Sequence, residues 1–124
     1  MTRTIRVVLV EDNQVFREAL ELLFSLQDDI DVVAAVDNGS DAAAVCAAQL
    51  PDVVVLDYRL PGLDGLQAAN AVREAAPDAR VVFLTASLSP SEARQLFEAG
   101  AVACLTKDSE LDAIIGAIRD AAHA

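Results

Sequence analysis

Short apolar runs rich in β-branched residues recur along the chain, and a helix-forming segment separates each run from the next. Five runs have this character: residues 4–10, 30–36, 52–57, 80–85 and 102–105. Runs of this length are typical of strands buried on both faces, whereas the segments between them show the spacing of amphipathic helices. The alternation predicts a parallel sheet covered by helices on both faces, a flavodoxin-like, doubly wound α/β fold.

Capping signals mark where several predicted helices begin and end. Asp64 is an N-cap candidate for a helix that reaches Ala76, and Ser89 stands before Pro90 with Glu92 three residues further on. Gly100 is placed to end the helix that Ser89 begins. The other predicted helices cover residues 14–26, residues 40–49 and a segment capped by Ser109-Glu110-Leu111-Asp112.

We expect the apolar faces of these helices to be buried against the sheet rather than to mark an interface. In the first helix, one face holds Phe16, Leu20 and Leu23, widened by Val15, Ala19, Leu22 and Leu26. In the last helix, the face consists of Leu111, Ile114, Ile115 and Ile118.

The 124 residues are enough for one domain with its own core, and 54% of them are hydrophobic. We treat residues 1–124 as a single domain, with no DNA-binding domain in the chain. Strand order 2-1-3-4-5, numbered along the chain, places the first and third strands of the five-stranded sheet side by side.

The formal charge of −11 argues against nucleic-acid binding by this segment, because binding to the phosphate backbone requires clustered Lys and Arg side chains. Cys46 and Cys104 lie far apart and form no CxxC motif, so we expect reduced thiols. The sequence shows no signal peptide and no apolar stretch of the ~18 residues that a bilayer requires. We therefore expect a cytoplasmic protein that does not enter a membrane.

Polar residues follow four of the apolar runs, where the predicted strands end. Glu11 and Asp12 close the first run and Asp57 closes the third. Thr85 closes the fourth, and Lys107 follows the fifth. The carboxyl ends of parallel strands meet at one edge of a sheet, where open α/β sheets bind ligands. Adjacent strands lie ~4.8 Å apart, so Asp12 and Asp57 would be near neighbours and the long side chain of Lys107 could reach them.

Three carboxylates in one hollow indicate a metal site. Two unit charges 4 Å apart repel by roughly 4 kcal/mol at an effective dielectric of 20, and a divalent cation would remove this cost. The ligands are all oxygen atoms, which favours Mg²⁺ or Mn²⁺ over zinc. A turn at Pro61-Gly62 would direct a backbone carbonyl, that of Arg59, toward the metal.

Asp57 is the candidate nucleophile of this site. An aspartate carboxylate can take a phosphoryl group and form an acyl phosphate. Such a transfer depends chiefly on charge neutralisation, which the metal, the Lys107 ammonium and the Thr85 hydroxyl would supply.

Several short motifs surround these residues. They are Glu11-Asp12, the segment from Leu56 to Gly65, Leu84-Thr85-Ala86, Ala99-Gly100-Ala101 and Leu105-Thr106-Lys107-Asp108. Together they resemble the receiver domains of bacterial two-component response regulators, from Ile5 to about Ala122. The segment after Asp57, with Asp108 after Lys107, is most similar to the LuxR-type subfamily, in which a helix-turn-helix domain follows the receiver. The chain would be either an excised receiver or a single-domain regulator.

The resemblance implies that Asp57 accepts a phosphoryl group from a phosphohistidine on a sensor histidine kinase. Asp12 would bind Mg²⁺ directly and Glu11 through a water, while Thr85 and Lys107 hold the phosphoryl group. The surface of the fourth helix, fifth strand and fifth helix would then change, and a partner or a second copy would dock. Transcription would be controlled through a helix-turn-helix domain outside this chain. Slow hydrolysis would act as a timer, so we do not expect a conventional enzyme.

One departure from the family pattern concerns the switch. Three residues before the lysine, many receivers carry Tyr or Phe, but this chain has Cys104, which is smaller and bonds only weakly. Either the switch works without a ring, or coupling runs through other parts of the fourth helix and fifth strand. By resemblance, Arg59 and Ser87 flank the hydrolytic water and tune the lifetime of the acyl phosphate.

Three other functions fit parts of the pattern. A hydrolase or phosphatase of the haloacid-dehalogenase type would need a second aspartate two residues after Asp57, where this chain has Arg59. A phosphorylation-independent interaction or dimerisation module is favoured only by Cys104. Flavin binding is disfavoured because the loop after the first strand is acidic where a cofactor phosphate needs donors.

Overall fold

Five parallel strands form the centre of the computed structural model, which describes residues 4–60 and 63–123. They are β1 (Ile5–Val10), β2 (Ile30–Val36), β3 (Val53–Leu56), β4 (Arg80–Thr85) and β5 (Ala103–Thr106). The sheet has the order β2-β1-β3-β4-β5, which confirms the predicted fold class and topology. The fifth strand lies one residue later than predicted.

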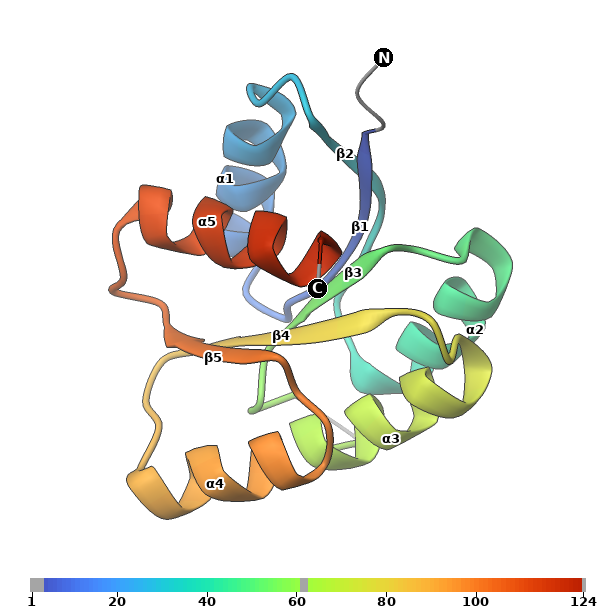
Figure 1. Ribbon diagram of the computed structural model, residues 1–124, viewed down its shortest axis with the longest axis vertical. Coiled ribbons are helices and arrows are strands. Elements are labelled where there is room, and N and C mark those ends of the chain that lie inside the picture. Colours follow the sequence, from blue (N-terminus) through green and yellow to red (C-terminus); the bar gives the residue numbers. More distant parts are fainter. Residues whose placement is uncertain (1–3, 61–62, 124) are drawn as a thin grey trace.

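Helices cover both faces of the sheet (Figure 1). They are α1 (Gln14–Ser25), α2 (Gly39–Gln49), α3 (Gly65–Ala75), α4 (Pro90–Glu98) and α5 (Leu111–Ala122). Because side chains alternate along a strand, β1 sends Ile5, Val7 and Leu9 into the core beneath α1 and α5. Val8 and Val10 enter the second core, beneath α2, α3 and α4.

The strand register brings several strand ends to one edge of the sheet. Val10 lies level with Leu56 in β3, and Leu56 lies level with Phe83 in β4. All four residues of β3 are buried, so Asp57 is the first residue of this segment to leave the sheet. The residues that follow β1 and β3 therefore emerge side by side at the carboxyl edge.

Two predicted helix starts are confirmed and one is wrong. Asp64 and Ser89 each form a capping box with the residue three positions on. The start of α5 is different, because its N-cap is Glu110 and makes no side-chain capping bond. Ser109 instead donates its amide to the Thr106 carbonyl at 3.0 Å, which closes the turn after β5. At the end of α4, Gly100 adopts φ +102°, the left-handed conformation that favours glycine.

The prediction of a broad buried face on α1 was wrong. The buried residues are Leu20 and Phe24, not Leu23, which is only partly buried. Phe24 continues the i, i+4 row through Leu20 that faces the sheet. Residues beside this row point away from the sheet, and three of them are exposed by 62–79%: Val15, Leu22 and Leu26. In α5 the predicted face is buried at Ile114, Ile115 and Ile118, and Leu111, at the start of the helix, is partly buried.

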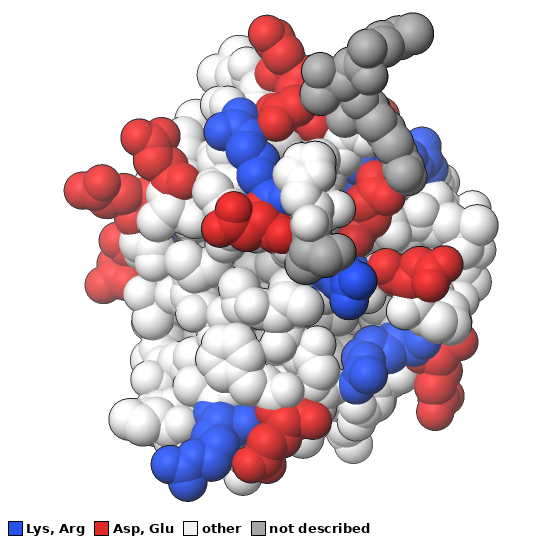
Figure 2. Space-filling model, viewed as in Figure 1, with Lys and Arg blue, Asp and Glu red and all other residues white. Residues whose placement is uncertain are grey.

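The charged side chains are distributed unevenly over the surface. Figure 2 shows most of the acidic groups in the upper part and at the margins of the face seen in Figure 1, and a largely uncharged area over β5 between α4 and α5. The helices described in the structure include none long and apolar enough to cross a membrane.

Candidate functional site

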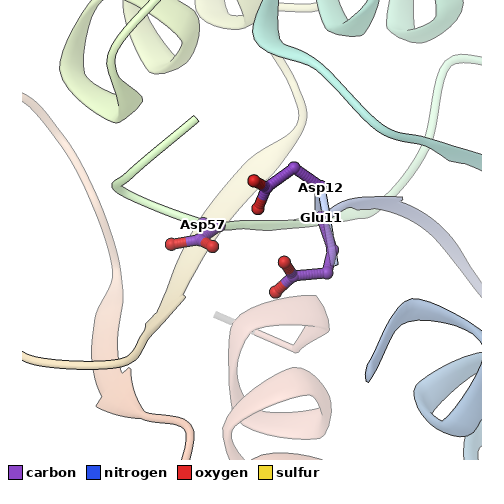
Figure 3. Close-up of side chains that lie close together, drawn as sticks. All are labelled: Glu11, Asp12 and Asp57. Atoms are coloured by element: carbon purple, nitrogen blue, oxygen red, sulfur yellow. The ribbon is translucent and has the colours of Figure 1, made fainter. Parts of the chain in front are cut away.

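Three carboxylates converge at the carboxyl edge of the sheet (Figure 3). Glu11 and Asp12 follow β1, and Asp57 follows β3. One oxygen from each lies within 4.8 Å of the others, so the predicted acidic cluster is present. Glu11 and Asp57 are only 2% and 4% exposed, whereas Asp12 faces solvent. Buried anions at this spacing call for a cation, and the all-oxygen donor set fits a hard divalent ion.

Lys107 supplies one positive charge to the cluster. Its Nζ lies 2.5 Å from Glu11 Oε1 and 3.0 Å from Asp57 Oδ2, so the side chain reaches back across β4 as predicted. The ring of Phe16, in the first turn of α1, lies 4.8 Å from the same ammonium. With the acids ionised, three negative charges face one positive charge and leave a net charge of −2.

The two ends of this ion pair have shifted pKa values. Burial raises the pKa of Glu11, and the hydrogen bonds that it accepts from Lys107 and from the Asn13 amide only partly offset this. Burial also acts to lower the pKa of Lys107, but hydrogen bonds to Glu11 and Asp57 outweigh it, so the net pKa is raised. Lys107 therefore stays charged at neutral pH and holds the two carboxylates together.

Thr85 lies at the end of β4, beside β3, and is completely buried. Its Oγ1 is a buried polar side-chain atom without a hydrogen-bond partner among the described residues. A buried hydroxyl without a partner is costly, and such orphans gather where a ligand completes the bonding. Beside the acid cluster, the same carboxyl edge thus holds two groups that can donate to an incoming oxyanion, the Lys107 ammonium and the Thr85 hydroxyl.

The loop after Asp57 connects the acid cluster to α4. The backbone amide of Arg59 donates to Asp57 Oδ1 at 3.0 Å. Its guanidinium lies over the Tyr58 ring and 3.4 Å from Glu92 on α4. The predicted role of the Arg59 carbonyl as a metal ligand stays a prediction, and the Pro61-Gly62 turn lies outside the described residues.

Of the predicted switch and lifetime residues, Arg59 donates its amide to Asp57, whereas Cys104 and Ser87 make no polar contact with the cluster that the structure records. Cys104 is partly buried in β5, level with Phe83, and burial raises the pKa of its thiol to about 11. The Tyr58 ring packs edge-on against Phe83, with ring centroids 6.4 Å apart. Ser87 is exposed in the loop between β4 and α4. The functional roles of Cys104 and Ser87 stay predictions.

Comparison with known proteins decides the family. Residues 7–119 match the family described as the response regulator receiver domain. This chain belongs to that family. The matched residues make up nearly the whole chain, and they include all of the strand-end residues described above.

Relatives place the receiver domain among regulators of the NarL/LuxR kind. It is 40% identical over 118 residues to the probable transcriptional regulatory protein NarL of Mycobacterium tuberculosis, covering 95% of this chain and 55% of that protein. A nitrate/nitrite response regulator protein homologue of Haemophilus influenzae is 34% identical, and the match covers 96% of this chain and 57% of that protein. The chain thus spans about half the length of these curated relatives.

Solved structures agree with this placement. The signal receiver domain of NarL from M. tuberculosis superposes with a TM-score of 0.92 at 38% identity, covering 98% of both chains. A LuxR-family two-component response regulator from Aurantimonas sp. SI85-9A1 superposes with a TM-score of 0.91 at 31% identity, covering 97% of this chain and 86% of that one. The receiver domain is therefore that of a two-component response regulator of the NarL/LuxR kind.

Three residues near the site were not singled out from the sequence as parts of it. The sequence predicts Phe16 only as part of the apolar face of the first helix and Glu92 only as a helix-capping residue, and Tyr58 lies inside the motif from Leu56 to Gly65. No local signal could have shown that Phe16 contacts Lys107, because the contact joins distant parts of the chain. The ion pair between Arg59 and Glu92 likewise joins residues far apart in the sequence, so no local pattern indicates it.

Proposed function

We propose that this receiver domain takes a phosphoryl group onto Asp57 from a phosphohistidine of a sensor histidine kinase. The observation that carries the proposal is the buried Asp57 carboxylate, held by the Lys107 ammonium at 3.0 Å within the acid cluster. An oxygen of Asp57 attacks the phosphorus, a P–O bond forms, and the P–N bond to the imidazole breaks with its electrons kept by the nitrogen. Lys107 and the unpaired Thr85 hydroxyl stabilise the charge on the transferred group.

The acid cluster fits Mg²⁺ or Mn²⁺, which Asp12, Asp57 and the Arg59 carbonyl would hold directly and Glu11 through a water. When bound, the ion supplies neutralisation of the carboxylates and of the phosphoryl oxygens. The domain's own residues fix the acceptor: the Val10 carbonyl accepts from the Asp57 amide at 3.1 Å, and Lys107 and the Arg59 amide each bind one carboxylate oxygen. The carboxylate is therefore oriented before a donor arrives.

The response follows from added charge rather than from turnover. An acyl phosphate adds negative charge at the edge of the sheet, and Thr85 and Lys107 follow it. The surface of α4, β5 and α5 then changes, and a partner or a second copy of the chain docks. Where a helix-turn-helix domain follows the receiver, this step controls transcription through that domain, while the receiver itself binds no nucleic acid. Slow hydrolysis ends the signal, so the domain acts as a timer and not as a conventional enzyme.

Intact mass spectrometry tests the proposal. We expect incubation with Mg²⁺ and acetyl phosphate to add one phosphoryl group that is labile to base. The adduct should be absent from Asp57→Asn and present in Asp108→Asn, a matched change beside Lys107. Absence of any adduct, with acetyl phosphate and with candidate kinases alike, would reject the proposal and favour a phosphorylation-independent interaction module. Release of product from a generic phosphomonoester would instead indicate a hydrolase.

A further inference from the structure

Arg59 contacts both the acceptor and a helix that lies apart from it. Its amide binds Asp57 Oδ1, whereas its guanidinium turns outward, with Cζ 5.6 Å from the centroid of the Tyr58 ring. From there Nη2 reaches Glu92 Oε2 at 3.4 Å, in the first turn of α4. A single residue thus links the loop that carries the acceptor to the helix that begins the proposed output surface.

The two carboxylate oxygens of Glu92 contact different groups. Oε1 accepts from the Ser89 amide at 3.0 Å and closes the capping box of α4. Oε2 faces the Arg59 guanidinium. The ion pair is long, and its side chains are 55% and 26% exposed, so it is easily broken in favour of a stronger partner.

A phosphoryl group on Asp57 would be such a partner. It replaces one negative charge with roughly two and offers three acceptor oxygens, and guanidinium groups bind phosphate in a bidentate manner. Asp57 lies only two residues from Arg59 along the chain. Cys104 cannot supply the aromatic ring that many receivers use to transmit phosphorylation. A contact between the acceptor loop and α4 that needs no such ring could transmit it in this chain instead.

We propose that Glu92 is a positioning residue that holds the Arg59 guanidinium away from Asp57, and that phosphorylation draws the guanidinium across and frees the first turn of α4. The inference rests on the proposed phosphoryl transfer and adds to it a regulatory step. That step exchanges one ion pair for another and breaks no covalent bond. Glu92 therefore lowers the rate of phosphorylation by competing for Arg59.

A double-mutant cycle tests the competition. The proteins are the wild type, Glu92→Gln, Arg59→Met and the double variant, each phosphorylated with acetyl phosphate and Mg²⁺ and followed by intact mass. Glutamine removes the charge but still closes a capping box. Methionine removes the guanidinium and keeps the backbone amide and carbonyl of residue 59. Glu98→Gln, which removes an equal charge from the exposed side of α4, is the matched control.

We expect Glu92→Gln to speed phosphorylation by about twofold to fivefold, the scale of one exposed ion pair, and Glu98→Gln by less than about twofold. In the Arg59→Met background, Glu92→Gln should change the rate by less than about twofold. An equal effect of Glu92→Gln with and without Arg59, or no effect at all, would overturn the inference. If the Asp57 adduct still formed in those cases, the proposed phosphoryl transfer would stand.

Amide hydrogen exchange gives a second measurement, and its result would not depend on Glu92 if that residue served only to cap α4. With Mg²⁺ and beryllofluoride as the phosphoryl mimic, exchange in residues 90–93 of the wild type should become faster. In Arg59→Met and in Glu92→Gln the mimic should leave this exchange unchanged, since the link is already absent. An identical increase in all of the proteins would show that α4 responds by another route.

Discussion

Replacing Thr85 with valine should stabilise the unphosphorylated domain and weaken its response. The side chain is 0% exposed, and its Oγ1 lacks a hydrogen-bond partner in the part of the chain that the structure describes. A buried hydroxyl without a partner costs about 1–3 kcal/mol, and valine puts a methyl group of similar size in its place. Taking the lower end, the free energy of unfolding should rise by about 1 kcal/mol, which raises Tm by about 4 °C in a domain of this length.

Thermal unfolding followed by circular dichroism, without Mg²⁺, measures this change. The matched control is Thr106→Val on the neighbouring strand, because the Thr106 hydroxyl donates to Asp108. Losing that bond should lower the free energy of unfolding by about 0.5–1.5 kcal/mol, so the same substitution acts with opposite signs at two sites. A Thr85→Val protein that is less stable than the wild type would refute the reasoning.

The same variant links stability to the proposed function. Asp57 and Lys107 are intact in Thr85→Val, so the acyl phosphate should still form. The change in amide exchange across α4 that follows phosphorylation should shrink, because the hydroxyl that would bind the phosphoryl group is gone. A full response in the variant would show that Thr85 only fills space.

Three further predictions concern backbone, metal and pH. Gly100→Ala should lower the free energy of unfolding by at least about 1 kcal/mol, since φ is +102° and the new Cβ would lie 2.5 Å from the Arg73 guanidinium. Gly116→Ala, inside α5, should raise the free energy of unfolding by about 0.5–1 kcal/mol. Urea unfolding of both variants checks these opposite signs. Mg²⁺ at 100 times its Kd should stabilise the domain by about 2.7 kcal/mol, and a thermal-shift titration should show most of this lost in Asp12→Asn. The pKa of Glu11 in the folded state lies above the unfolded value of 4.5. Between these two pKa values the folded state binds more protons than the unfolded state, so the free energy of unfolding falls as pH rises. Urea unfolding across that pH window should show this fall in the wild type and not in Glu11→Gln.

The order of elements could be read from the sequence because it depends on local pattern. Five β-branched runs separated by helical segments specify a parallel sheet, and the capping boxes at Asp64 and Ser89 depend only on residues three positions apart. Errors arose where a choice depended on contacts at long range. The buried row of α1 runs through Leu20 and Phe24 because of how the helix lies on the sheet, which no hydrophobic pattern on one helix can specify.

The acid cluster was predictable for a similar reason. In a parallel sheet the carboxyl ends of neighbouring strands share an edge, so the positions of Glu11, Asp12 and Asp57 in the sequence already imply that they meet. The long side chain of Lys107 makes its arrival there tolerant of small errors in strand length. The one-residue shift of β5 left the predicted contact with Asp57 intact.

The sequence by itself determined the fold class, the strand order and the edge of the sheet where the polar residues gather, because periodicity and strand ends are properties of neighbouring residues. Only the tertiary structure decided that the Thr85 hydroxyl lacks a partner and that Arg59 turns toward Glu92. Both facts depend on which atoms from distant segments fill the space around one group. Hydrogen bonds and ion pairs require placement within a few tenths of an ångström, which packing of the whole domain fixes and local pattern does not.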